Sequence, residues 1–154
     1  MLDVGCGTGY LLRSLAAGLP AAVELAGIDP APGMVAAAQA LVGDDPRLSV
    51  TVGVAERLPW RNGAFDLVVS TTSFDHWEDQ EAGLRECARV LAPGGQLVLT
   101  DLFSCLLLPT LLAGHRGRAR TVRRADRLLT LAGFRSQAWQ RPYGLILRTV
   151  TATR

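Results

Sequence analysis

The chain has 154 residues, of which 49% are hydrophobic and 19% are charged, and its formal net charge is +2. This composition is typical of a globular protein with a sizeable core and excludes a disordered chain. The nearly balanced charge argues against nucleic acid as a partner. The sequence shows neither a signal peptide nor an apolar run near the ~20 residues of a membrane span. We therefore expect one domain over residues 1–154, located in the cytoplasm and without a membrane association.

Strands and helices alternate along the first two thirds of the chain. The predicted elements are, in order, strand 1–4, helix 9–18, strand 23–28, helix 32–42, strand 48–53, strand 65–70, helix 79–91 and strand 96–101. This alternation is typical of a parallel sheet covered by helices on both faces. Pro93, Gly94 and Gly95 follow the last helix, and we expect them to end it and to turn the chain into the next strand.

The last third of the chain contains a different pattern. We expect a short apolar helix near 104–113 and an amphipathic helix over 121–132. Two further strands, 134–141 and 145–152, flank a turn at 142–144 and form a hairpin. Because the strands of a hairpin are antiparallel, the sheet should be mostly parallel with one reversed strand.

Cysteine usage limits the chemistry of the chain. The three cysteines are Cys6, Cys87 and Cys105. They are too few and too scattered for a disulfide framework or a zinc site. We therefore expect three buried thiols and no metal site.

The first strand runs directly into a glycine loop, in which Gly5, Gly7 and Gly9 occupy alternate positions and Asp3 lies two residues before the first of them. Glycines permit a tight turn and a close approach of the backbone to a ligand, and the following helix offers free N–H groups at its start. This pattern predicts a nucleotide-cofactor loop. A dinucleotide loop places its third glycine one residue later, where this chain has Tyr10, so a nicotinamide-dependent oxidoreductase is disfavoured.

Further motifs follow the glycine loop in a fixed order. They are a strand ending at Asp29, the segment 55–60, the strand 65–70, the segment 89–95 and the strand 96–101. Together with the G-x-G-x-G loop, they resemble the class I S-adenosylmethionine-dependent methyltransferases, in particular the small-molecule family typified by the ubiquinone-biosynthesis methyltransferases. The resemblance covers residues 1 to about 134.

The resemblance implies an α/β fold. Its sheet is Rossmann-like, mostly parallel and seven-stranded, in the order 3-2-1-4-5-7-6 with one antiparallel strand and helices on both faces. The implied cofactor is S-adenosyl-L-methionine, and the implied reaction is methyl transfer to an oxygen, nitrogen or carbon atom of a small-molecule acceptor. The alternative that we keep open is a non-catalytic methyltransferase-like domain that binds a ligand or a partner.

Members of this family usually carry a helical segment ahead of the first strand, and it covers the cofactor. This chain starts inside that strand, at Met1 and Leu2. We therefore expect the usual N-terminal cover helix to be missing. A homodimer or a partner chain that covers the site would supply the cover instead.

By resemblance, Gly5, Gly7 and Gly9 contact the methionyl part of the cofactor through their backbone. Asp3 either holds the amino-acid end of the cofactor, directly or through water, or bonds the amides of the loop. Asp29 lies 20 residues after Gly9, where doubly wound folds place the acid that accepts hydrogen bonds from the ribose hydroxyls.

The adenine end of the expected site departs from the family pattern. Met34 matches a methionine that packs on the adenine, or it is an ordinary core residue of its helix. Val54 stands where the family commonly has an acid that bonds the adenine amino group, and valine accepts no hydrogen bond. The backbone N–H of Ala55 and the side chain of Glu56 are then the remaining candidates. Ser70, at the end of the fourth predicted strand, completes the cofactor-binding candidates.

Three residues are candidates for acting on the acceptor. Methyl transfer is an in-line displacement, in which the protein mainly positions the nucleophile and excludes water. An oxygen or nitrogen nucleophile also needs a proton acceptor, and His76 and the adjacent Asp75 lie in the segment that flanks the transferable methyl in the family. His76 either acts as a general base or orients this segment. Asp101 is a base or a polar contact to the acceptor.

Two segments near the expected site have open interpretations. Residues 106–112 form an apolar stretch, which is either a lid over an apolar acceptor or a packing or dimer surface. Residues 115–127 contain six arginines. They bind an acidic or nucleic-acid substrate or, because no aromatic residues interleave them, form a solvated surface.

Overall fold

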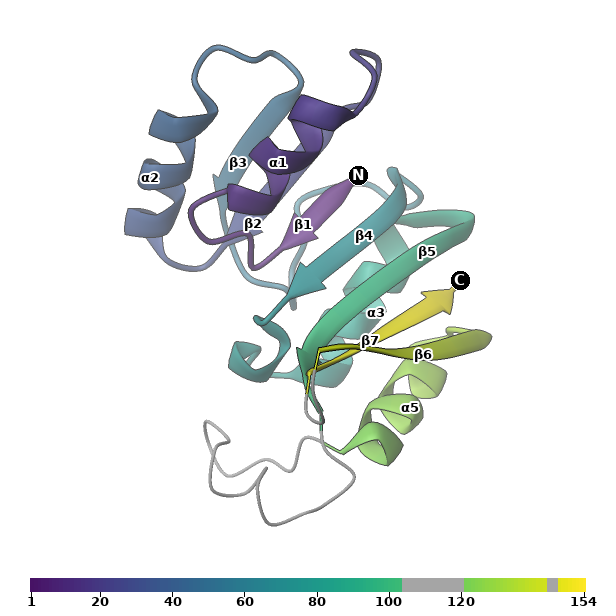
Figure 1. Ribbon diagram of the computed structural model, residues 1–154. Helices are drawn as coiled ribbons and strands as arrows, with labels where there is room; N and C mark the ends of the chain where they lie inside the picture. The colour runs from purple at the N-terminus through teal and green to yellow at the C-terminus, as the bar shows by residue number, and fades with distance from the viewer. Residues whose placement is uncertain (104–120, 144–146) are drawn as a thin grey trace.

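A seven-stranded sheet forms the centre of the computed structural model, which describes residues 1–103, 121–143 and 147–154 (Figure 1). The strands lie in the order β3-β2-β1-β4-β5-β7-β6. Their bounds are β1 (Leu2–Val4), β2 (Leu25–Asp29), β3 (Leu48–Val52), β4 (Phe65–Thr71), β5 (Leu91–Leu102), β6 (Ser136–Tyr143) and β7 (Leu147–Thr153). β7 is antiparallel to both of its neighbours, whereas the pairs among β1 to β5 are parallel. The predicted fold, with this strand order and one reversed strand, is confirmed.

Helices cover both faces of the sheet. They are α1 (Tyr10–Gly18), α2 (Pro32–Val42), α3 (Gln80–Val90) and α5 (Val122–Leu131), together with the short 3-10 helix η1 (Phe74–His76). Figure 1 shows α1 in front of the sheet and α3 behind it. The predicted bounds of these four α-helices differ from the observed ones by at most one residue at either end. η1 was not predicted, and the helix expected near 104–113 lies outside the described residues.

Two helices, α3 and α5, begin where a side chain accepts hydrogen bonds from their first N–H groups. Asp79 precedes α3, and its Oδ1 accepts hydrogen bonds of 3.0 Å from the N–H groups of Glu81 and Ala82. Thr121 precedes α5, and its hydroxyl accepts from the N–H of Arg124 at 3.2 Å. Such side chains satisfy N–H groups that have no partner inside the helix.

Two hydrophobic clusters hold the layers together. One lies under α1, where Leu12 and Ala16 pack with Leu25 of β2. The larger one joins the other face of the sheet to α3 and α5, with Leu84 and Leu129 among its fully buried members. Cys6 and Cys87 are buried thiols, as expected, whereas Cys105 lies outside the described residues. Burial raises the pKa of the Cys6 thiol to about 12 and also raises the pKa of the Cys87 thiol, so both thiols stay protonated at neutral pH.

Several predicted strand boundaries are wrong: β2, β6 and β7 each begin two residues later than expected, and the largest difference is at the start of β5. The strand expected over 96–101 begins at Leu91, because the backbone pairs again before the Pro-Gly-Gly segment: Phe65 pairs with Leu91 and Leu67 with Gln96. The turn expected at Pro93–Gly95 is therefore a bulge inside β5, in which Gly94 has a φ of 79°. β6 runs on to Tyr143, which pairs with Leu147, although the sequence suggested that a turn begins at residue 142.

Candidate functional site

The glycine loop joins β1 to α1 in a conformation that only glycine adopts easily. The φ angles of Gly5, Gly7 and Gly9 are 78°, 53° and 73°. The N–H groups of Gly5 and Cys6 both donate to the carbonyl of Ile28 in β2, at 2.8 and 3.1 Å, which holds the loop against the neighbouring strand. A Cβ atom added to Gly7 would meet no atom within 4 Å. The middle of the loop therefore borders open space, into which a ligand fits.

Two carboxyl groups lie beside this loop. Asp29, the last residue of β2, accepts a hydrogen bond from the N–H of Gly7 at 2.9 Å and another from the N–H of Ala31 at 3.0 Å. The sequence suggested an acid that bonds the loop amides, but assigned this alternative to Asp3. Asp3 itself is only 2% exposed. Burial, and secondly the charge of Asp29, raise the pKa of Asp3 to about 7. An isolated buried carboxylate is unfavourable, so this position favours a cationic ligand group.

The side of the loop next to α2 is partly apolar. Met34 is 48% exposed at the start of α2, which rules out its interpretation as a core residue. Val54 is 44% exposed, whereas Ala55 is buried. Oε1 of Glu56 accepts a hydrogen bond of 3.0 Å from the N–H of Asp79. One oxygen of Glu56 thus fastens its loop to the start of α3.

Hydroxyl groups connect the glycine loop to the turn after β4. The Ser73 hydroxyl donates to the carbonyl of Val4, at the end of β1, at 2.8 Å. It shares a 2.7 Å hydrogen bond with the hydroxyl of Ser70, which is completely buried. The indole N–H of Trp77 donates to the same Ser73 oxygen at 3.4 Å. Sequence reasoning named Ser70 and missed Ser73, because only the approach of β1 to β4 shows which hydroxyl lies between them.

The acceptor-side candidates lie in contrasting surroundings. Asp75 is buried in η1, whereas the adjacent His76 is exposed. Asp101 is buried near the end of β5, and its Oδ1 accepts from the N–H of Leu102 at 2.6 Å. Asp101 is also the cross-strand partner of Arg148 in β7, a buried arginine that sequence reasoning missed. These two oppositely charged residues lie opposite each other only because of the β5–β7 register, which no local pattern reveals.

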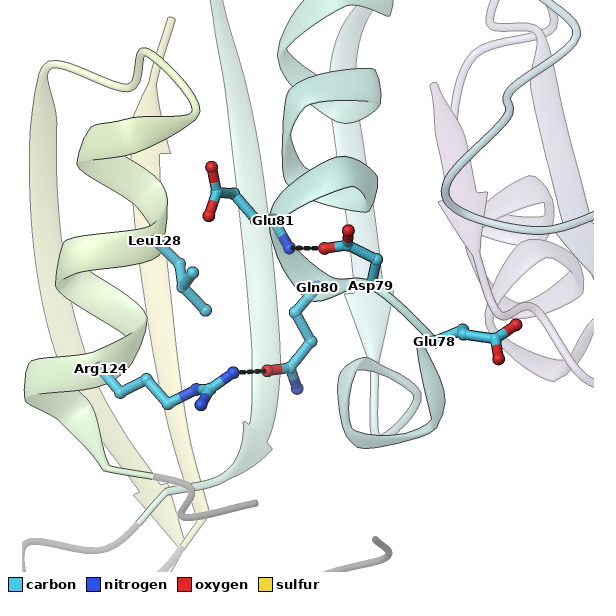
Figure 2. Close-up of a pocket in the computed structure, with 6 residues that line it drawn as sticks. All are labelled: Glu78, Asp79, Gln80, Glu81, Arg124 and Leu128. Atoms are coloured by element: carbon cyan, nitrogen blue, oxygen red, sulfur yellow. Dashed lines mark hydrogen bonds between the residues drawn. The ribbon is translucent and has the colours of Figure 1, made fainter.

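A cavity of about 350 Å³ lies between the starts of α3 and α5. Figure 2 shows the six residues that line it: Glu78, Asp79, Gln80, Glu81, Arg124 and Leu128. The buried Gln80 connects two elements, because its Nε2 donates to the carbonyl of Phe74 at 3.0 Å and its Oε1 accepts from Arg124 at 3.2 Å. Arg124 belongs to the arginine-rich segment noted in the sequence. The part of that segment before residue 121, and the apolar stretch 106–112, lie outside the described residues.

These placements gather most of the predicted residues at one edge of the sheet. In open parallel sheets, ligands bind beyond the carboxyl ends of the strands. The glycine loop follows β1, Asp29 ends β2, Ser70 lies one residue before the end of β4, and Asp101 lies one residue before the end of β5. The structure thus brings the cofactor candidates and the acceptor candidates to the same edge.

Several proteins with similar sequences have methyltransferase names. The chain is 37% identical over 150 residues to a malonyl-[acyl-carrier protein] O-methyltransferase from Geobacter sulfurreducens, which covers 88% of this chain and 55% of the relative. It is 34% identical to a ubiquinone/menaquinone biosynthesis C-methyltransferase from Geobacter sp., covering 71% and 47%. A norajmaline N-methyltransferase from Rauvolfia serpentina is 36% identical, with 64% and 34% covered. The chain therefore spans about a third to a little over half of each relative.

Solved structures share the fold at low sequence identity. The [4+2]-cyclase SpnF superimposes with a TM-score of 0.85 at 22% identity, covering 99% of this chain and 74% of that one. A Haloferax volcanii complex of the Trm112 methyltransferase activator with a putative methyltransferase gives 0.84 at 20% identity, with 99% and 80% covered. Phosphoethanolamine N-methyltransferase 2 from Haemonchus contortus, in complex with S-adenosyl-L-methionine, gives 0.85 at 16% identity, with 100% and 48% covered.

The family itself is established by the first two thirds of the chain. Residues 2–99 match the family described as "Methyltransferase domain". The matched range contains the glycine loop, Asp29 and the turn after β4, which are the features that the geometry singles out. The chain belongs to the methyltransferase domain family.

Proposed function

We propose that the protein transfers a methyl group from S-adenosyl-L-methionine to an oxygen, nitrogen or carbon atom of a small-molecule acceptor. The observation that carries the proposal is the glycine loop, whose three positive φ angles leave open space at Gly7 while Asp29 bonds its backbone. Relatives with O-, N- and C-methyltransferase names support the reaction class. The names of these relatives differ in the acceptor, so we propose only that the acceptor is a small molecule.

The residues at this edge fit the proposed cofactor. Asp3 is a buried carboxyl group suited to the ammonium of the methionyl part. Each carboxylate oxygen has further lone pairs, so Asp29 is able to accept bonds from ribose hydroxyls while it holds Gly7 and Ala31. The half-exposed Met34 and Val54 offer apolar surface for the adenine. Glu56 and Ser70 hold the surrounding loops in place, since Glu56 bonds the N–H of Asp79 and Ser70 bonds the hydroxyl of Ser73.

When bound, S-adenosyl-L-methionine supplies the electrophilic methyl group. The protein's own part is to position the acceptor and to accept a proton where the nucleophile carries one. We assign this second task to His76, which is exposed on η1, with Asp75 and Asp101 as the buried carboxyl candidates. These roles are proposals that rest on the position of the three residues at the carboxyl edge.

The proposal is tested with cofactor that carries a labelled methyl group and a panel of hydroxyl, amine and activated-carbon acceptors. We expect label in one acceptor class with the wild-type chain, and at least a tenfold lower rate with Asp29→Ala, because one charge-assisted bond contributes about 1.5–3 kcal/mol. Wild-type protein that binds the cofactor but labels no acceptor would favour the alternative, a non-catalytic methyltransferase-like binding domain. The exposed Val54, in place of an acid, is the observation that favours this alternative.

The assembly of the protein is also a proposal. One structural neighbour is a complex of a methyltransferase activator with a putative methyltransferase, which supports a partner chain for this protein. A homodimer stays a prediction. Light scattering on the purified protein distinguishes a monomer from a homodimer. Among the residues that the structure describes, no helix is long and apolar enough to cross a membrane. The cytoplasmic location and the absence of a nucleic-acid partner stay predictions.

A further inference from the structure

The turn that follows β4 has an unusual backbone. Thr72 has a φ of 53°, in the left-handed region that a β-branched residue rarely adopts. Its N–H donates to the carbonyl of Thr100 at 2.8 Å, which extends the β4–β5 pairing by one step beyond the end of β4. The chain therefore leaves the sheet abruptly at Thr72. This departure sets the position of the next residue, Ser73.

Ser73 uses all of the hydrogen-bonding capacity of its hydroxyl. A serine hydroxyl has one proton to donate and two lone pairs to accept with. Its proton goes to the carbonyl of Val4, and the hydroxyl of Ser70 and the indole N–H of Trp77 therefore both donate to its oxygen. One side chain thus joins the end of β1, the end of β4 and the residue that follows η1.

The same side chain fills the space behind the glycine loop. A Cβ atom added to Gly5 would lie 2.2 Å from the Cβ of Ser73 and 2.3 Å from its oxygen. Gly5 and Ser73 are therefore in direct contact, whereas a Cβ at Gly7 would meet nothing within 4 Å. A small displacement of the glycine loop at Gly5 must be followed by Ser73, because well-packed groups leave no slack between them.

Trp77 connects Ser73 to α3 and to η1. Its indole ring packs on α3 at Gly83, where an added Cβ would lie 2.5 Å from the ring atom Cε3. Trp77 also stacks edge-on against Phe74 of η1, with ring centroids 5.1 Å apart. Asp75 and His76 lie between these two aromatic residues in the sequence. The position of the Asp75–His76 turn is therefore tied to Ser73 through the ring of Trp77.

We propose that Ser73 is a positioning residue, which fixes the turn that carries Asp75 and His76 against the glycine loop, so that a cofactor bound at the loop sets the place of the acceptor-side groups. The inference rests on the proposed function, since it takes the glycine loop as the cofactor site. It assigns no contact between Ser73 and the cofactor. The serine acts through Gly5 on one side and through Trp77 on the other.

The test uses S-adenosylhomocysteine, the demethylated product of the cofactor, as probe and the emission of Trp77 as signal. We expect S-adenosylhomocysteine to change the tryptophan emission of the wild-type chain, and we expect Trp77→Phe to remove that change. Ser73→Ala should bind S-adenosylhomocysteine about tenfold more weakly, because the net contribution of the bonds that it loses is about that of one typical hydrogen bond. At saturating S-adenosylhomocysteine, the emission change of the Ser73→Ala protein should be less than half of the wild-type value.

A matched control separates positioning from general stability. Thr149→Val removes the 2.8 Å hydroxyl bond between Thr100 and Thr149, which joins β5 to β7 away from the glycine loop. It should lower the unfolding temperature while leaving the affinity and the emission change as in the wild type. Ser73→Cys keeps a hydrogen-bonding group at this position, on a larger atom that forms weaker hydrogen bonds, and should give intermediate values. It replaces Ser73→Ala if that variant does not fold.

The outcomes are distinguishable. A wild-type chain that does not bind S-adenosylhomocysteine overturns the proposed function together with this inference. Binding without any emission change from Trp77, or a Ser73→Ala protein with the full emission change at saturation, overturns the positioning role alone. Equal losses in Ser73→Ala and Thr149→Val would also overturn it, because they would show only a common effect of stability.

Discussion

At the scale of single residues, the pair of carboxyl groups beside the glycine loop has the largest consequences. Asp29 is held by two backbone N–H groups, whereas Asp3 is buried with the negative charge of Asp29 nearby. A carboxyl group in such a place is partly protonated near neutral pH, since burial and a like charge both disfavour its charged form. Ligand binding that brings a positive charge to Asp3 should therefore release a proton.

This proton release makes the affinity for the cofactor depend on pH. The pKa of Asp3 is raised to about 7 in the free protein, and an ammonium group beside it favours the charged form and lowers that pKa. Because the complex holds fewer protons, the affinity rises with pH, by about tenfold from pH 6 to pH 8. Calorimetric titration with S-adenosylhomocysteine at both values measures the rise. Asp3→Asn should bind S-adenosylhomocysteine weakly and with equal affinity at pH 6 and pH 8. A wild-type affinity that does not change with pH would contradict the assignment of Asp3 to the ammonium group of the ligand.

Two glycines of the loop should respond differently to the same substitution. A Cβ at Gly7 meets no atom within 4 Å, so Gly7→Ala should lower the free energy of unfolding by only ~1–2 kcal/mol, the cost of a left-handed alanine. It should still reduce the affinity for S-adenosylhomocysteine more than tenfold, because the added methyl group enters the space of the ligand. Gly5→Ala meets Ser73 at 2.2 Å and should destabilise the fold far more. Thermal unfolding and calorimetry on both variants check this. A Gly7→Ala protein with wild-type affinity would place the ligand elsewhere.

At the scale of elements, α3 is the helix that ties the site together. Asp79 caps it, Glu56 bonds the N–H of Asp79, and the ring of Trp77 packs against it at Gly83. Its second half is held to the segment around Leu58 by Glu86, which accepts from the Leu58 N–H at 2.8 Å. The helix therefore joins the turn after β4 to the loop that follows β3, and both of these flank the proposed cofactor site.

Gly83 should be the position at which α3 is most sensitive to a small increase in volume. Alanine favours a helix by up to ~1 kcal/mol over glycine, but a Cβ at Gly83 would lie 2.5 Å from the Trp77 ring, and overpacking costs about 1–3 kcal/mol. We expect Gly83→Ala to lower the free energy of unfolding. Gly33→Ala in α2, where a Cβ meets nothing within 4 Å, is the matched control and should leave it unchanged or raise it. Urea unfolding measures both, and a stabilised Gly83→Ala protein would contradict the packing described.

At the scale of the whole molecule, the sequence predicted most of the architecture, because strands and helices alternate with clear ends. The strand order came from the family resemblance, and the hairpin after residue 134 correctly indicated one reversed strand. The extended start of β5 escaped prediction, since Pro93–Gly95 signals a turn locally and only the partner strand β4 shows that pairing continues around it. Local signals thus located the elements, and pairing decided their ends.

The residues of the candidate site also divide into those that the sequence predicted and those that only the strand pairing reveals. Residues at strand ends, such as Asp29 and Asp101, were found because a strand that ends in an acid is visible in the sequence. Ser73 and Arg148 were not found, since each takes its place through contacts with strands distant in the chain, β1 for Ser73 and β5 for Arg148. No pattern in the neighbourhood of either residue encodes those contacts.

The most direct test of the account is the calorimetric titration of the purified chain with S-adenosylhomocysteine, beside Asp29→Ala under the same conditions. The account predicts micromolar binding of one ligand per chain, and a clear loss of affinity when the Asp29 carboxylate is removed. Absence of binding to the wild-type protein, or equal binding by both proteins, would contradict the claim that the carboxyl edge of β1 and β2 is the cofactor site.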